Sequence, residues 1–370
     1  AFMVGGFLSG NAFAQTTIGI QNFETPAATP TLTYSATGSG GSAGVNTGLT
    51  GSTGLPASSP YYTDGTAGYR VIGASRTLTF SSSDTRNFSN ITFSCRLMAL
   101  SYQSTGNGLD STDTVSVEVS PDGGITWHKR LQVAGNNNSY WAYDATGIAT
   151  DTYAANSTFT SFSAPSANLN TAGFSTLRIT SLPSVAALIV RITLLNNNSA
   201  EAWVIDEVKV TGTPIPTLNS VTLASSLSST YGSATTGIGF TASGTSLTGN
   251  ITATAQSGYE VSTTQNSAYT SSVSVASGTT VYVRSAAIKA VGTHNNATAV
   301  VLSGGGAASN ANVTTSASGN SVAEAALTIT GISAQNKSWD GNTTVTVTGT
   351  PAYSGLVNGE SFGVTGTPSA

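Results

Sequence analysis

The sequence predicts an all-β protein built from β-sandwiches, and three observations predict this class. Charged residues make up 8% of the 370 residues, against about 25% in an average soluble domain, so the usual helix-forming surface residues are scarce. Thr, Val, Ile and Tyr favour pleated strands, and 41 glycines suit the tight turns between them. Residues 115–119 and 204–210 alternate apolar and polar side chains, as a strand with one buried face does.

The first 14 residues read as a signal peptide remnant. They form an apolar stretch that ends in the A-x-A pattern Ala12-Phe13-Ala14, and cleavage there leaves Gln15 as the mature N-terminus. No later apolar run approaches the about 20 residues that a helix needs to cross a bilayer. We therefore expect an exported protein, extracellular or on a bacterial cell surface, with no membrane span in this chain.

Residues 15–212 form the first predicted domain. About nine strands in about 200 residues suit a jelly-roll-type β-sandwich. The segment 213–216 is the predicted linker, because Pro214 and Pro216 lack the N–H group that a central strand donates.

Two further units follow the linker. Residues 217–318 contain about seven short strands separated by turn residues, a spacing typical of an Ig-like β-sandwich. Residues 325–370 begin a third β unit that is too short to close a core of its own, which predicts a truncated repeat.

Composition and motifs argue against several function classes. The net charge is −4 and the 12 Lys and Arg residues are scattered, so we expect no nucleic-acid partner. Cys95 is the single cysteine, which excludes an internal disulfide and a Cys-rich zinc site, and we expect it in a core strand. The glycine runs 38–41 and 304–306 are interpreted as flexible loops. No motif predicts catalysis, and we expect no enzyme activity.

Two resemblances concern the C-terminal half. Residues 337–344 and 348–360 look like the YDG repeat of large bacterial surface proteins, with Trp339 where that motif usually has Tyr. This resemblance implies a β-rich stalk or adhesin module and no catalysis. Residues 217–318 resemble the Ig-like repeats of secreted Bacteroidetes proteins.

Two resemblances concern the first domain. Residues 120–127, Ser-Pro-Asp-Gly-Gly-Ile-Thr-Trp, reproduce the Asp-box pattern, in which the Asp caps a hairpin turn and the Trp packs beneath it. Residues 22–24 and 203–208 are similar to the first and last strands of carbohydrate-binding and MAM-like jelly rolls, which lie side by side. If these strands pair, Glu24 and Asp206 can supply oxygen ligands to a structural calcium ion; the alternative is two solvated carboxylates.

Aromatic residues beside amide and carboxylate groups predict a glycan site, because a ring offers a flat apolar face and the polar groups orient the sugar. Ordinary loop packing is the alternative explanation of the same residues. The predicted ligand-binding residues are Tyr61, Tyr62, Tyr69, Tyr140, Trp141 and Tyr143.

These observations favour a non-catalytic extracellular or cell-surface adhesion protein whose first domain binds a glycan or another surface ligand. Two alternatives stay open. The domains can be accessory modules of an exported hydrolase or nuclease whose catalytic domain lies outside this chain, or parts of a purely structural surface filament.

Overall fold

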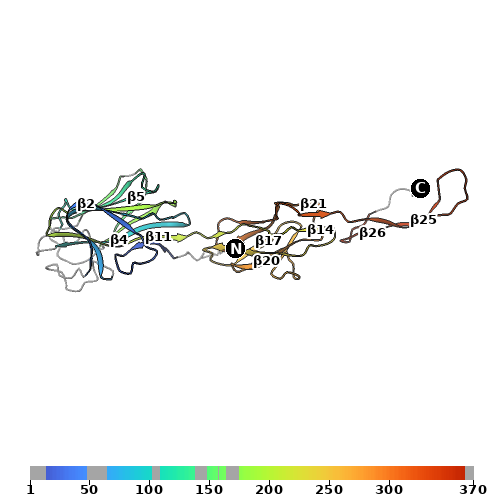
Figure 1. Cartoon of the computed structure of the whole chain (residues 1–370), viewed down its shortest axis with the longest axis horizontal. Helices are drawn as coiled ribbons and strands as arrows, with labels where there is room; N and C mark the ends of the chain where they lie inside the picture. Colours follow the sequence, from blue (N-terminus) through green and yellow to red (C-terminus); the bar gives the residue numbers. More distant parts are fainter. Residues whose placement is uncertain are drawn as a thin grey trace, which may run out of the picture. The chain divides into compact units, whose positions relative to one another are not determined.

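The structure is a computed structural model that describes residues 14–47, 65–101, 109–137, 148–156, 158–163 and 175–362. These residues form strands, turns and loops without a helix, so the predicted all-β class is confirmed. The chain divides into two compact units whose boundary falls between Ile215 and Pro216, inside the segment predicted as the linker. Figure 1 colours the N-terminal unit blue to green and the C-terminal unit yellow to red. The predicted signal segment, apart from Ala14, lies outside the described residues.

One 11-stranded sheet forms the N-terminal unit. Its nine main strands run in the order β7 (Ile148–Thr152), β9 (Ser175–Leu182), β4 (Phe88–Ser101), β11 (Glu201–Pro214), β3 (Ala67–Phe80), β10 (Ile189–Leu195), β5 (Thr114–Ser120), β6 (His128–Ala134) and β8 (Thr160–Ser163). Two further strands, β1 (Thr16–Gln21) and β2 (Tyr34–Thr47), pair with β11 and β3.

The sheet folds into two layers at Gly73, in the middle of β3. Tyr69–Ile72 pair with β11, whereas Ser75–Thr79 pair with β10. Gly73 has φ of +53°, a left-handed conformation that glycine adopts at no steric cost, so the strand turns here from one layer to the other. The layers enclose a single core that includes Leu97, Val117, Ile179, Ile192, Trp203 and Ile205.

A buried ion pair connects the two ends of the strand order. Arg130 of β6 donates to Asp151 of β7 through Nε at 2.9 Å, and the Thr160 hydroxyl of β8 donates to the same carboxylate at 2.6 Å. Arg130 also donates to the main-chain oxygens of Thr152 and Ala154. Because Arg130 is 2% and Asp151 8% exposed, the sheet is nearly closed by a desolvated contact.

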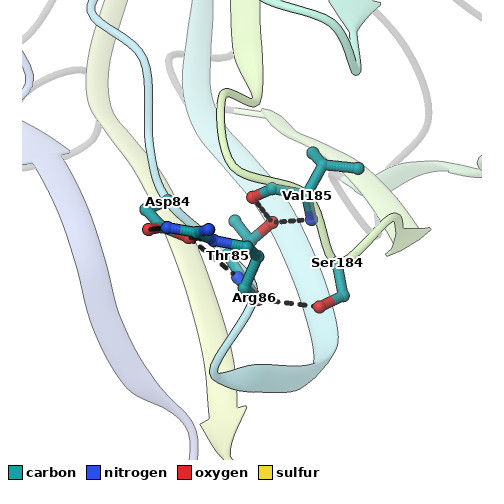
Figure 2. A network of polar contacts seen from close by, with 5 residues as sticks. All are labelled: Asp84, Thr85, Arg86, Ser184 and Val185. Atoms are coloured by element: carbon teal, nitrogen blue, oxygen red, sulfur yellow. Dashed lines mark hydrogen bonds and ion pairs between the residues drawn. The ribbon is translucent and has the colours of Figure 1, made fainter.

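Two connecting turns of this unit are joined by the buried side chain of Thr85, as Figure 2 shows. The Thr85 hydroxyl donates to the oxygen of Pro183 at 2.9 Å and accepts the N–H of Val185 at 2.8 Å. The Ser184 hydroxyl donates to the main-chain oxygen of Thr85. The neighbouring pair of Asp84 and Arg86 is exposed.

Several sequence predictions can be compared with these strands. β1 pairs with β11, with Thr16 opposite Gly212 and Gln21 opposite Val208, so the first and last strands lie side by side. Residues 22–24, which were expected in the first strand, lie after the end of β1, and residues 203–205 pair with β3 and β4 instead. Cys95 is buried in β4, also as expected. The interpretation of residues 38–41 as a flexible loop is wrong, because they lie in β2 and pair with β3. β2 is mostly exposed, so burial imposes no hydrophobic pattern on its sequence.

The C-terminal unit begins with a small β-sandwich. One sheet has the order β13 (Val221–Thr222), β23 (Ala311–Thr314), β22 (Thr298–Gly304), β17 (Ile251–Ala255) and β19 (Ser272–Val275). A second has the order β15 (Ile238–Ala242), β20 (Thr279–Ser285) and β18 (Tyr259–Ser262). Phe240, Ile251, Val261, Val283 and Leu302 belong to the core. Smaller sheets are β12 (Thr217–Leu218) with β16 (Gly244–Thr245), and β14 (Ser228–Thr230) with β24 (Ser321–Ala323) and β21 (Gly292–Thr293).

The segment that resembles a YDG repeat forms a hairpin of β25 (Thr328–Ala334) and β26 (Val347–Ser354). Every residue of β25 is exposed, including Ile329 at 60%, and Trp339 beyond it is 85% exposed. Two strands bury too little apolar surface to be stable independently. The described part of this segment therefore has no core of its own.

Candidate functional site

Three carboxylates converge where two loops of the N-terminal unit approach each other. Asp110 and Asp113 lie in the turn before β5, and Glu201 is the first residue of β11. One carboxylate oxygen from each lies within 4.8 Å of the others. Asp113 is fully buried, Glu201 is 2% exposed and Asp110 is partly exposed. The cluster therefore places three acidic groups in a largely desolvated site.

Hydrogen bonds fix the position of Asp113 within this carboxylate cluster. Its Oδ2 accepts the N–H of Asp110 at 2.8 Å and its Oδ1 accepts the N–H of Asn197 at 3.0 Å. Its own N–H donates to the oxygen of Asp110 at 3.0 Å, which closes a tight turn. The side chain thus bridges the turn before β5 and the turn before β11.

The electrostatics of the cluster are unfavourable without a counter-charge. Burial, a hydrogen bond with Asp113 and repulsion from Asp113 and Asp110 raise the pKa of Glu201 to about 8. Its Oε2 has no hydrogen-bond partner, and neither does Nδ2 of Asn196, which is 1% exposed. Closely spaced buried carboxylates are stabilised by a proton or by a cation. The donor set consists of oxygens, which hard divalent cations prefer, so these residues can hold a metal ion.

The predicted calcium ligands, Glu24 and Asp206, are not members of this cluster. Oε1 of Glu24 accepts the N–H groups of Thr66 and Ala67 at 2.6 and 2.7 Å, and Oε2 accepts the Thr66 hydroxyl at 2.9 Å. Desolvation raises the pKa of Glu24, but these hydrogen bonds outweigh it and the net shift is downward. Asp206 is fully buried at a β-bulge of β11 and accepts the N–H of Glu207 at 2.7 Å. A calcium ion shared by Glu24 and Asp206 stays a prediction.

Tyr69 is the predicted glycan residue that the structure describes, and its placement corrects the prediction. It lies in β3 and is 4% exposed. Its ring packs against Phe23 at 5.9 Å and Tyr34 at 5.8 Å between ring centroids. A ring enclosed in the core offers no face to a sugar. The other predicted ligand residues lie outside the described residues: Tyr61, Tyr62, Tyr140, Trp141 and Tyr143.

A second feature of interest is the side of the layer formed by β2, β3, β10, β5 and β6 that points away from the core. This surface is called the outer face. Side chains in register form two polar rows across it. The first row is Ser35, Thr79, Arg191, Glu118 and Lys129. The second row is Thr37, Thr77, Thr193, Ser116 and Gln132. All ten are exposed or half-exposed, while Leu78, Ile192, Val117 and Leu131, which lie between the two rows, belong to the core.

An aromatic ring packs on the middle of the first row, at Arg191. The guanidinium of Arg191 donates to both oxygens of Glu118, at 2.7 and 3.1 Å, and lies 4.0 Å from the ring centroid of Trp127. The Trp127 indole donates to the oxygen of Gly124 at 3.0 Å. Nearby, Lys129 lies 4.2 Å from the ring centroid of Phe159, which is 40% exposed. Planar rings and paired polar groups therefore share one exposed surface.

The Asp-box hairpin positions Trp127. The Asp122 carboxylate accepts three hydrogen bonds: from the N–H of Thr126 at 2.9 Å, from the Thr126 hydroxyl at 2.5 Å and from the Ser120 hydroxyl at 2.7 Å. The predicted hairpin with an Asp-capped turn is confirmed by these contacts and by the pairing of β5 with β6.

Sequence reasoning missed the carboxylate cluster. Asp110 and Asp113 are three residues apart in a turn, which is ordinary in any loop, and Glu201 follows much later in the chain. The paired turns that bring them together depend on the strand order β3, β10, β5. The run Asn196-Asn197-Asn198 before Glu201 was the available signal, since Asn side chains often fold tight polar turns.

No protein-family model matches the chain, and no curated protein matches its sequence. In the part of the chain that the structure describes, there is no helix of the length and apolarity required to cross a bilayer. The geometry of the chain itself therefore has to support any statement of function.

Proposed function

We propose that this chain is a non-catalytic binding region of an extracellular or cell-surface protein, and that its N-terminal unit binds a glycan on the outer face. The observation that carries the proposal is the stack of Trp127, Arg191 and Glu118. A sugar ring needs a flat apolar surface for its C–H groups and both donors and acceptors for its hydroxyls. The stack and the adjoining Ser, Thr and Gln side chains supply all three.

The charge of this surface favours a neutral or weakly acidic glycan. Arg191 and Glu118 neutralise each other, so Lys129 leaves the first row with a single positive charge. Such a surface lacks the concentrated positive charge that holds a nucleic-acid backbone. The predicted signal peptide segment and the resemblances to repeats of secreted proteins support the extracellular location.

We propose that the cation of the carboxylate cluster is calcium and that it is structural. Calcium takes six to eight oxygen ligands in flexible geometry, so main-chain oxygens and water can complete a set begun by three carboxylates. The cluster has no His or Cys, the side chains that favour zinc.

A glycan array probed with the 370-residue chain, with and without calcium, tests the binding proposal. We expect saturable binding to at least one polysaccharide, and we expect Trp127→Ala to weaken it about tenfold or more, because truncating a Trp at the centre of a binding surface costs about 2 kcal/mol or more. Tyr269→Ala is the matched control. Tyr269 stacks on Arg284 at 3.9 Å, and Arg284 pairs with Glu260, in the C-terminal unit.

The possible outcomes separate the candidates. Binding lost in Trp127→Ala and kept in Tyr269→Ala supports the outer face. Binding lost only in Trp141→Ala or the Tyr61 and Tyr62 variants places the site on the aromatic loops predicted from sequence. A blank array with a folded protein contradicts glycan binding and favours a structural filament or an accessory role beside an enzyme.

A further inference from the structure

We infer that a calcium ion held by Asp110, Asp113 and Glu201 fastens four segments of the N-terminal unit to one another, and that this fastening forms only in calcium-rich surroundings outside the cell. The calcium ion balances the negative charge of the buried carboxylates. The hydrogen bonds around the cluster connect the ion to the four segments. The location outside the cell rests on the proposed function.

The first step concerns the orphaned polar atoms. Glu201 is almost fully buried, one of its oxygens lies within 4.8 Å of oxygens of both aspartates, and its Oε2 lacks a partner. A buried acceptor without a donor costs about 1–3 kcal/mol, and more when it is charged. A cation that coordinates this oxygen removes that cost and the repulsion between the carboxylates together.

The second step concerns the segments that meet here. The oxygens of Asp113 and Leu109 accept the N–H groups of Gly135 and Asn136, both at 3.0 Å, which attaches the residues after β6 to the turn before β5. A Cβ atom at Gly135 would clash with the main chain of Leu109 and Asp110. The residues after β6 therefore pack directly against the turn that carries two of the ligands.

The remaining two segments are attached through an asparagine. Asn196 Oδ1 accepts the N–H of Gly73 at 2.7 Å, and its main-chain N–H donates to the oxygen of Ala74 at 2.9 Å. Asn197 donates to Asp113 as described above. The corner of β3, where the two layers join, is thereby connected to the turn that carries Glu201.

The third step concerns calcium concentration. Extracellular modules bind calcium with Kd of about 10⁻⁴–10⁻³ M, whereas proteins that respond to calcium inside cells bind it at about 10⁻⁷–10⁻⁵ M. A site with two buried and one partly exposed carboxylate and few fixed additional ligands belongs to the weaker class. It stays empty before export and fills afterwards.

Hydrogen exchange of the full chain in millimolar calcium and in EGTA tests the fastening. We expect calcium at about ten times Kd to slow exchange about tenfold at the amides of Gly73, Gly135, Asn136 and Asn197, because binding lowers the opening constant by the factor 1 + [L]/Kd. The amides of Thr85 and Thr126, in other turns of this unit, should change much less, and Leu227 in the C-terminal unit should not change.

Variants of the full chain complete the test. Glu201→Gln should abolish the calcium response, while Asp84→Asn, an exposed carboxylate of the same unit, should keep it. Alkylation of Cys95 checks that each variant is folded, because this single thiol is buried in β4 of the N-terminal unit. Terbium luminescence excited through Trp203 reports occupancy, since this indole donates to the oxygen of Leu195 beside Asn196.

Each outcome is decisive. No calcium effect on exchange, or an undiminished effect in folded Glu201→Gln, overturns the site. Uniform slowing across the N-terminal unit overturns the local fastening, and a Kd below about 10⁻⁷ M overturns the requirement for export. Glycan binding is measured separately, so a blank array with a local calcium response would leave this site standing.

Discussion

The two units of the chain each bury a polar centre, and the two centres differ in charge. In the N-terminal unit it is the carboxylate cluster of Asp110, Asp113 and Glu201. In the C-terminal unit it is Asn320, which is 1% exposed. Nδ2 of Asn320 donates to Asn295 Oδ1 at 3.1 Å and to the oxygen of Ser316 at 2.8 Å, and its Oδ1 accepts the N–H of Leu227 at 2.9 Å.

Charge distinguishes the two centres, because both are buried but only the carboxylate cluster consists of acidic groups. The amide of Asn320 has two donors and an acceptor, and neighbouring groups satisfy all of them without any net charge. Carboxylates only accept hydrogen bonds when ionised, so a set of three needs a proton or a cation between them. The first centre therefore invites a cation, whereas the second is complete.

The largest effect is expected at the other buried charge of the N-terminal unit. Arg130→Met leaves Asp151 buried without its cation, and breaking a buried pair in this way costs about 3–5 kcal/mol of unfolding free energy. Urea unfolding followed by Cys95 alkylation measures it, because burial raises the pKa of this thiol and protects it in the native state. Arg86→Met, which breaks an exposed pair, should cost much less, because solvent screens exposed charges.

A double variant separates lost pairing from lost packing. Arg130→Met with Asp151→Leu removes both charges, and replacing both members of a buried pair is often nearly neutral. We expect it to recover most of the loss. If the double variant is as unstable as Arg130→Met, the stability derives from packing and hydrogen bonds, and the contrast between charged and neutral centres loses its basis.

The next effect concerns the neutral centre. Asn320→Ala leaves the buried N–H of Leu227 without its acceptor and removes the Nδ2 hydrogen bonds to Asn295 and Ser316, which we expect to cost about 1–3 kcal/mol. Hydrogen exchange at Leu227 and Val322 measures the loss, with the exposed Asn312→Ala as control. The loss should be the same in calcium and in EGTA. A calcium-dependent loss would show that the second centre also needs an ion.

Much of the fold was predictable, because a strand with one covered face alternates buried apolar and exposed polar side chains, and this alternation is visible in the sequence. Val115, Val117 and Val119 alternate with half-exposed residues in β5, as expected from the sequence. β2 was missed because its side chains are mostly exposed. In β11 the alternation of buried and exposed residues is weak for the opposite reason, because residues 201–206 are all buried.

The sites were less predictable, because they depend on which turns become neighbours. The Asp-box hairpin was anticipated since the hydrogen bonds that cap its turn fall within residues 120–127. Tyr69 was misassigned because an aromatic residue looks the same in a loop as in a core strand. Glu201 joins Asp110 and Asp113 only after β10 has paired with β5 and β3, and no local pattern encodes that pairing.

The smallest expected effect is a change in pKa, and it concerns two exposed carboxylates, one in each unit. Hydrogen bonds from Thr126, then Ser120, lower the pKa of Asp122 to about 2. A hydrogen bond from Lys337, followed by one from Asn342, lowers the pKa of Asp340. In both cases the contacts stabilise the turn fully above the ordinary pKa of 3.8 and are lost as the pH falls through the lowered value.

The two pKa shifts have different causes, and their dependence on salt concentration distinguishes these causes. Lys337 is a cation whose attraction is screened by salt, whereas Thr126 and Ser120 are neutral. NMR titration of the aspartate carboxyl carbons at low and high ionic strength should therefore show the pKa of Asp340 rising towards its ordinary value in salt while that of Asp122 hardly moves. Equal movement of both would mean that long-range charge, and not the local hydrogen bonds, holds the Asp122 carboxylate ionised in its turn.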